Sequence, residues 1–407
     1  MITIQHEGSL ITAGVFGEFT VADYQEFERE VLASLRLTGR VDLLVDLRDM
    51  LRYTLDVAWE DVRFVRAHAH DFRRVAVIAR DELTVWLGWI TRLLTSAEVR
   101  VFDTEPGARE WLAEGAAPAA QAASALPPRG PLVSVAELAA RLDDPGLVIF
   151  DCRHDLMVKT VGTDAYAQGH LPGAHFAHVD HDLAGPPTGR NGRHPLPDRG
   201  AFVAWLGRMG VSRQTEVVAY DASGGTYAAR LWWMLRHWLG HERVAVLDGG
   251  WDAWVKTGHP VSTEVPVPQP VHYDGGLTPA VTVDAGHLLA RLGSPGLVII
   301  DARAADRFRG QNETIDPVAG HIPGAVNRFF RDNLDAMGFF KSAADLRTAF
   351  TPLIGTHDPA QVVHSCGSGV SACHNLLAME IAGLGGTRLY PGSWSEWCSD
   401  PSRPVET

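Results

Sequence analysis

The chain contains little cysteine, and the few cysteines are scattered. Its 407 residues include four cysteines, and these form no Cys-x-x-Cys pair. A disulfide scaffold and a cysteine-based zinc site are therefore excluded, and we expect neither a metal ion nor a cofactor. Scattered free cysteines are typical of a reducing compartment, so we predict a cytoplasmic protein.

A long apolar run and an excess of positive charge are also missing. No stretch approaches the roughly 18 uninterrupted apolar residues of a membrane span, and the first residues, MITIQHE, lack the basic and apolar regions of an export signal. Lys and Arg number 36 against 49 Asp and Glu, which gives a net charge of −13. This balance argues against nucleic acid as a partner, and an anionic substrate would need a local basic patch.

One cysteine stands in a sequence that builds a reactive thiol. Residues 362–366, VVHSC, read as an apolar strand that stops at Cys366; a glycine-rich turn follows, and a helix is predicted over 371–381. Glycines let the backbone turn tightly and aim N–H groups inward, and the helix adds the positive end of its dipole. Such a cradle favours the thiolate, the nucleophilic form of cysteine. A buried structural cysteine is the alternative.

The part of the chain beyond residue 130 is a repeat. Four segments recur in the same order, which indicates a duplicated domain. The matched pairs are 146–153 with 296–303, 169–174 with 320–325, 217–221 with 362–366, and 251–254 with 394–397. Asp221 stands where the second copy has Cys366, so we expect the first copy to be catalytically silent.

The domain organisation follows from the repeat and from two stretches without apolar periodicity. Short apolar runs alternate with amphipathic helical stretches, which predicts an α/β protein with mainly parallel sheets. In such sheets ligands gather beyond the carboxyl ends of the strands, where Cys366 falls. We predict an N-terminal α/β domain over 1–115, a linker over 116–130, the silent copy over 131–265, a linker over 266–278 and the catalytic copy over 279–407.

These motifs resemble the tandem-domain rhodanese family. The resemblance rests on the loop Cys-Gly-Ser-Gly-Val-Ser at 366–371 and on the two His-(Leu/Ile)-Pro-Gly-Ala elements, and it spans roughly residues 131–405. The loop is most similar to that of the 3-mercaptopyruvate sulfurtransferases, Cys-Gly-Ser-Gly-Val-Thr, whereas thiosulfate-using rhodaneses usually have basic residues directly after the cysteine. Residues 1–115 resemble SpoIIAA-like, STAS-related domains through the strand at 41–48 and a Trp-rich helix at 83–94.

The resemblance implies a sulfurtransferase that works by ping-pong transfer. Cys366 would take a sulfur atom from an anionic donor, 3-mercaptopyruvate or thiosulfate, and become a persulfide. A thiol acceptor such as thioredoxin or glutathione, or cyanide, would then remove that sulfur. The N–H groups of Gly367, Ser368, Gly369, Val370 and Ser371 would hold the anionic persulfide, as an oxyanion hole holds its charge.

Arginine is the residue type that the donor's anionic group requires, because a guanidinium pairs bidentately with a carboxylate. Arg307 falls on the substrate-binding position of the resembled family. The mercaptopyruvate branch usually has a second arginine further along this loop, where this chain has Asp316. Arg190 and Arg193 of the first copy could restore the charge across the cleft; a plain surface loop is the alternative for both.

A Ser-His-Asp proton relay is a further implication of the resemblance. It would protonate the departing enolate, and the matching groups are Ser368 and His170, with Asp164 or Asp155 as the acid. Because His321 occupies the same motif in the second copy, a structural role for both histidines stays open.

The sequence leaves two other functions to consider beside sulfur transfer. A cysteine phosphatase needs an arginine six positions after the cysteine, and Ala372 stands there, which argues against phosphate chemistry. A sulfur carrier or sensing module without turnover is an alternative that the fold alone does not exclude. Repeated turnover with excess acceptor separates an enzyme from such a carrier.

Overall fold

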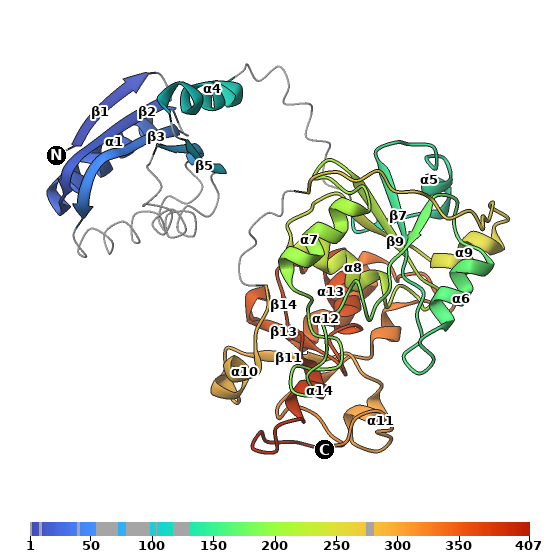
Figure 1. Ribbon diagram of the computed structural model, residues 1–407. Coiled ribbons are helices and arrows are strands. Elements are labelled where there is room, and N and C mark those ends of the chain that lie inside the picture. Colours follow the sequence, from blue (N-terminus) through green and yellow to red (C-terminus); the bar gives the residue numbers. More distant parts are fainter. Residues whose placement is uncertain are drawn as a thin grey trace. The chain divides into compact units, whose positions relative to one another are not determined.

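The computed structural model of the chain divides into two compact units, Met1–Ala125 and Leu126–Thr407 (Figure 1). It describes residues 2–7, 10–38, 41–53, 72–78, 98–102, 104–116, 130–273 and 281–407. The Trp-rich helix predicted at 83–94 lies outside these residues, as do most of the first predicted linker and part of the second. None of the helices in the described part is long and apolar enough to cross a bilayer.

The first unit is built on a five-stranded sheet in the order β1-β2-β3-β4-β5. β1 (Ile2–Glu7) and β2 (Leu10–Phe19) pair antiparallel, and β3 (Val41–Tyr53), β4 (Phe72–Ile78) and β5 (Glu98–Phe102) continue in parallel. Leu43 shares a core cluster with Val31 of α1 (Val21–Thr38), whereas Leu44 shares one with Trp111 of α4 (Glu105–Ala116). Successive strand residues point to opposite faces, so α1 and α4 cover the two faces of this sheet.

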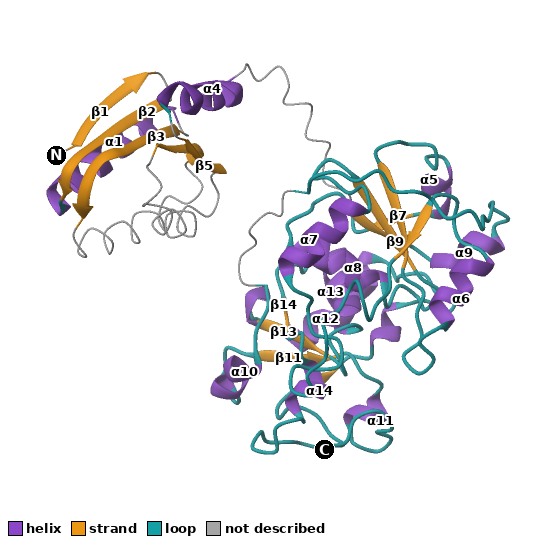
Figure 2. Ribbon diagram, in the orientation of Figure 1, coloured by secondary structure: helices purple, strands orange, loops and turns teal. Residues whose placement is uncertain are grey.

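The second unit holds two parallel sheets, one in each copy of the repeat (Figure 2). The first has the order β6-β10-β9-β7-β8, and the second has the order β12-β11-β13-β14. Their strands are β6 (Leu132–Val133), β7 (Leu147–Asp151), β8 (Ala174–Phe176), β9 (Glu216–Tyr220), β10 (Val244–Leu247), β11 (Val298–Asp301), β12 (Val326–Asn327), β13 (Val362–Ser365) and β14 (Arg388–Leu389). The interior strands β9 and β13 are buried along their whole length, as expected of parallel sheets that are covered on both faces. The predicted parallel α/β fold is confirmed.

Helices flank both sheets, and two of them join the copies. They are α5 (Val135–Ala139), α6 (Val161–Gln168), α7 (Arg199–Arg208), α8 (Ala228–Trp233), α9 (Gly250–Lys256), α10 (Ala285–Arg291), α11 (Ala305–Phe308), α12 (Ala343–Ile354), α13 (Ala372–Ile381) and α14 (Ser393–Trp397), with short π and 3-10 segments at Met234–Trp238, Phe330–Asn333 and Pro359–Gln361. α8 and α13 pack side by side between the two sheets (Figure 1). Trp232 of α8 and Leu377 of α13 belong to one buried cluster, so the copies share a core.

The repeated sequence Asp-x-Arg forms the same buried corner in both copies. Arg303 pairs through Nε and Nη2 with Asp301 and donates from Nη2 to the carbonyl of Gly320. Arg153 makes the equivalent bonds in the first copy. Trp394 lies 4.9 Å from the Arg303 Cζ atom, and Trp251 stands at the matching place in the first copy. The Asp-x-Arg and Trp segments therefore recur because they build the same structural corner in each copy. The Arg303 side chain is used for contacts within its own domain.

In the first copy, the loop after β9 binds the side chain of Asp221, the residue that replaces the cysteine. The buried Asp221 carboxylate accepts hydrogen bonds from the N–H groups of Ser223, Gly225, Tyr227 and Ala228 at 2.7–2.9 Å. The loop of the first copy therefore encloses an anion that the chain itself supplies.

We predict that Asp221→Ala lowers the free energy of unfolding by about 3 kcal/mol or more, because it leaves buried N–H donors without an acceptor. Denaturant unfolding followed by circular dichroism measures this change. Asp143→Ala, at an exposed position, serves as the control and should change stability by less than about 0.5 kcal/mol. Equal effects of the two substitutions would contradict the anion-cradle interpretation.

Candidate active site

Cys366 lies directly after the carboxyl end of β13, and only 1% of its surface is exposed. The Gly369 N–H donates to the Cys366 sulfur at 3.1 Å, and the Ser393 hydroxyl lies 3.9 Å from the same atom. The Cys366 N–H donates to the Ser393 oxygen at 3.1 Å. The strand, turn and helix expected around the cysteine are all present, with α13 starting at Ala372 directly after Ser371.

The turn between Cys366 and α13 depends on Gly369. Its φ of +79° is in the left-handed region, and a Cβ atom there would lie 2.2 Å from the carbonyl oxygen of Pro391. Neither condition suits an L residue with a side chain. The rest of the loop is packed as well, since Ser368 and Val370 are buried and the Gly367 carbonyl accepts the N–H of Ser395.

We predict that Gly369→Ala abolishes the function of the loop and destabilises the protein, because the added carbon collides with the main chain. Gly258→Ala is the matched control, since Gly258 also has a positive φ, of +77°, but has nothing within 4 Å of the added carbon. The control should cost about 1 kcal/mol from backbone strain alone and leave sulfur transfer intact. Thermal unfolding and a sulfur-transfer assay compare the two variants; similar results for both would show that the close approach to Pro391 is unimportant.

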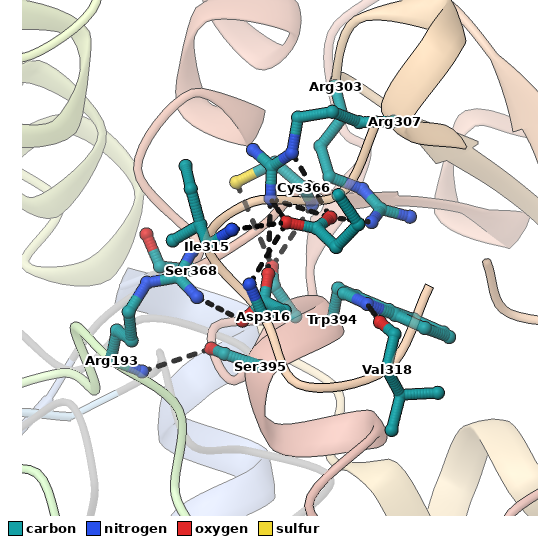
Figure 3. A network of polar contacts seen from close by, with 12 residues as sticks. Arg193, Arg303, Arg307, Ile315, Asp316, Val318, Cys366, Ser368, Trp394 and Ser395 are labelled. Carbon is teal, nitrogen blue, oxygen red and sulfur yellow. Dashed lines mark hydrogen bonds and ion pairs between the residues drawn. The ribbon is translucent and has the colours of Figure 1, made fainter. Parts of the chain in front are cut away.

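Two arginines and two carboxylates form a network beside the Cys366 loop (Figure 3). Arg307 of α11 pairs with Glu313 at 2.8 Å and with Asp316 at 3.1 Å. Arg193 of the first copy pairs with the other carboxylate oxygen of Asp316. A Cβ atom on Gly367 would lie 2.9 Å from Arg193 Nη2 and 3.7 Å from Arg307 Nη2, so both guanidinium groups lie against the residue that follows Cys366. The predicted positions 307 and 193 therefore meet across the two copies.

Arg190 does not join this network in the described part of the chain. Its residue is exposed, and its main-chain N–H donates to Thr188. The Arg193 N–H donates to Ser395 of α14, which holds the loop of the first copy against the second. The two arginines that the sequence grouped together are thus separated by the structure.

The two carboxylates of the network differ in their electrostatics. Burial raises the pKa of Asp316, and its pairing with Arg193 and Arg307 only partly opposes this effect. Burial acts on Glu313 too, but hydrogen bonds from Arg307 and from the backbone N–H groups of Asp316 and Ile315 outweigh it and lower the Glu313 pKa. Glu313 therefore organises the loop, whereas Asp316 is the more weakly stabilised anion.

Ser368 belongs to a chain of three polar side chains. It lies two residues after Cys366, and its Oγ atom is 2.8 Å from His194 Nδ1. His194 Nε2 is 3.0 Å from Asp180 Oδ1. The hydrogen bond with His194 is the largest of the effects that lower the pKa of Asp180, so this carboxylate stays ionised. An ionised Asp180 accepts from Nε2–H, which leaves Nδ1 free to accept from the Ser368 hydroxyl.

The structure corrects the predicted partner of Ser368, which is His194 and not His170. His170 is fully buried and stacks on Tyr166, and its ring nitrogens contact the main-chain carbonyls of Tyr166 at 2.8 Å and Glu264 at 2.9 Å. His321 repeats this arrangement in the second copy, where it stacks on Phe308 and contacts that residue's carbonyl. Both histidines therefore hold the corner of their own domain.

The proposed acids of the relay are corrected in the same way. Asp155 accepts the N–H groups of Met157 and Val158 in its own turn, and Asp164 is exposed on α6. Asp180 takes the acid position instead. Its distance of 14 positions from His194, and the 174 positions between His194 and Ser368, hid this chain of contacts from motif analysis. One signal was available, because His194 directly follows Arg193, which the sequence analysis had named as a candidate for the cleft, with a surface loop as the alternative.

Arg230 is a further residue that sequence analysis missed. Its side chain is completely buried on α8, and it donates to the carbonyls of Gly369 at 3.1 Å, His194 at 3.2 Å and Leu183 at 3.2 Å. One guanidinium thus links the Cys366 loop to the His194 segment across the two copies. A buried cation held by carbonyls is costly, and burial indeed lowers the pKa of Arg230.

Ser393 is a second missed residue and occupies a strained backbone position. Its φ of +53° is the single positive value for a non-glycine residue in the described part of the chain. The matching residue of the first copy is Gly250, whose φ is +55°. Comparison of the repeats could have revealed this position, because a serine replaces a glycine there only in the copy that carries the cysteine. This strained backbone conformation places the Ser393 hydroxyl next to the Cys366 sulfur.

One group of side chains in the described residues has the composition of a metal site. His154, Asp180 and His194 place possible ligand atoms within 4.8 Å of one another. Burial lowers the pKa of His154, which keeps the imidazole neutral, as a ligand must be. Asp180 and His194 already contact each other within the Ser368 chain, so a metal ion bound there would have to replace that contact.

Comparisons with known proteins identify relatives of both units. The model of the rhodanese-like domain matches residues 134–257 and 284–400, and the SpoIIAA-like model matches residues 10–113. A probable 3-mercaptopyruvate sulfurtransferase of Pseudomonas aeruginosa is 45% identical over 278 residues, 68% of this chain and 98% of that protein. Thiosulfate sulfurtransferase of Bos taurus is 35% identical over 268 residues, 62% of this chain and 85% of that protein. The structure of 3-mercaptopyruvate sulfurtransferase from Leishmania major is 32% identical, with a TM-score of 0.59, and covers 65% of this chain and 73% of that one.

Proposed function

The chain belongs to the rhodanese family and is a sulfurtransferase, and from this premise we propose that it takes sulfur from 3-mercaptopyruvate through a persulfide on Cys366. The observation that carries the choice of donor is the chain Ser368–His194–Asp180. Thiosulfate is the other donor class named among the relatives. The two donors differ in what leaves the sulfur atom, and only one of the leaving groups needs a proton.

The first half of the reaction moves one sulfur atom and one proton. The Cys366 thiolate attacks the donor sulfur, the sulfur–carbon bond breaks, and its electron pair passes to the enolate of pyruvate. The donor's thiol proton passes through Ser368 and His194 to the enolate, which gives pyruvate and an anionic persulfide. Asp180 stabilises His194 while it holds the proton. With thiosulfate, sulfite leaves as a stable anion and no proton transfer is required.

The surroundings of Cys366 suit an anionic intermediate. The Gly369 N–H already donates to the sulfur, and the corresponding loop of the first copy encloses the Asp221 carboxylate with four such groups. Arg307 and Arg193 would bind the donor's carboxylate next to the loop. An acceptor thiol, such as that of thioredoxin or glutathione, or cyanide would then attack the outer sulfur and restore the Cys366 thiolate.

We predict that Cys366→Ser abolishes sulfur transfer from either donor and leaves the fold intact, because the hydroxyl is close to the thiol in shape but is not a comparable nucleophile at neutral pH. Mass spectrometry after treatment with donor should find the wild-type chain heavier by one sulfur atom and the variant unchanged. Cys373→Ser is the control, since Cys373 is buried on α13 and its pKa is raised by burial to about 12. Sulfur added to the Cys366→Ser variant would remove Cys366 from the mechanism.

We also predict that His194→Gln lowers kcat with 3-mercaptopyruvate by about 100-fold or more, because it removes the proton relay, and changes kcat with thiosulfate far less. Steady-state assays with the two donors measure this difference within one protein. His170→Gln should instead lower thermal stability and affect both donors equally, since His170 holds a corner of the first copy. A His194→Gln variant impaired equally with both donors would contradict 3-mercaptopyruvate as the donor that the relay serves.

A further inference from the structure

The position between Arg193 and Arg307 is filled by a side chain of the protein. Asp316 uses one carboxylate oxygen for Arg193 and the other for Arg307. Its side chain is 2% exposed, whereas those of Arg193 and Arg307 are 29% and 18% exposed. The Asp316 carboxylate is therefore the most buried of these three charged groups, and it lies between the two guanidinium groups (Figure 3).

We propose that Asp316 is a specificity-determining residue that occupies the donor's anion-binding position and has to be displaced before a donor reaches Cys366. This inference rests on the proposed function, because it takes the two arginines as the donor's binding groups. Its chemical basis is that a donor carboxylate and the Asp316 carboxylate are the same ligand for the same pair of guanidinium groups.

The burial of Cys366 supports a displacement step. Only 1% of the cysteine is exposed, so an attack on a donor sulfur requires neighbouring groups to move. Asp316 is held in the network by side chains, because its two arginine contacts are the described hydrogen bonds that its carboxylate makes. Glu313, by contrast, also accepts the N–H groups of Ile315 and Asp316 and keeps the loop folded.

Charge neutralisation gives the displacement a consequence for selectivity. With Asp316 and Glu313 ionised, the positive charges of Arg193 and Arg307 are balanced within the network. A simple anion that displaces the Asp316 carboxylate gains little binding free energy, because the ion pairs it forms with the two arginines replace ion pairs that Asp316 already makes. A sulfur donor that also contacts the Cys366 loop gains additional binding free energy from those contacts. Asp316 would thus reject anions that carry no transferable sulfur and raise the KM of those that do.

The test compares Asp316→Asn and Asp316→Ala with the wild type in two measurements. Donor kinetics give KM and kcat, and calorimetric titration with inorganic sulfate in the Cys366→Ser background gives the affinity of the free anion site. Asp306→Asn is the matched control, since it removes one negative charge from a partly exposed position on α11, beside Arg307 in sequence, without contact to the guanidinium groups. It should leave both measurements unchanged.

We expect both Asp316 variants to lower the KM for the anionic donor about tenfold or more, with kcat changed by less than about threefold, and to bind sulfate at least about tenfold more tightly. Unchanged or raised KM with unchanged sulfate affinity would overturn the proposal and make Asp316 a structural or donor-binding group. The Asp316→Ala variant keeps the test valid if the asparagine variant folds poorly. Tighter sulfate binding without any sulfur transfer in the wild type would refute the proposed function while supporting the role of Asp316.

Discussion

The confinement of a negative charge by main-chain N–H groups is the constraint on which the rest of this structure depends. A buried parallel strand ends, a turn with a left-handed glycine follows, and a helix begins, so that N–H groups converge on one point. In the first copy four such N–H groups donate to the Asp221 carboxylate, and in the second copy the Gly369 N–H donates to the Cys366 sulfur. The surrounding residues lie around this arrangement: the Ser393 hydroxyl contacts the sulfur, Arg307 pairs with Glu313 beside the loop, and Ser368 contacts His194.

The second requirement is that the two copies keep a fixed position relative to each other, because the site is assembled from residues of both. Ser368 and Arg307 come from one copy, while His194 and Arg193 come from the other. Arg230 supports this position from within the shared core, since its guanidinium donates hydrogen bonds to carbonyls of both copies. A duplicated domain without its own cysteine is therefore an essential half of the site.

The sequence was sufficient wherever the chemistry was local. Cys366, its turn, the parallel sheets and the repeat are all encoded in contiguous segments, and the structure has them where they were expected. Prediction failed where partners are distant in sequence: His170 lies in a conspicuous motif but serves a corner, whereas His194 lies in no motif and meets Ser368 across 174 positions. Asp316 was noticed as a missing arginine, but only coordinates could show that its carboxylate bridges the remaining two.

The Asp221 loop also bears on why one half of a duplicated enzyme can lose its nucleophile without losing its shape. A loop whose amides converge on empty space would collapse or fill with water, whereas one that carries a built-in carboxylate is permanently saturated. The loop of the first copy therefore resembles an anion-binding loop with its anion permanently bound. The second loop, in contrast, is the one whose anion the proposed reaction would exchange between thiolate and persulfide.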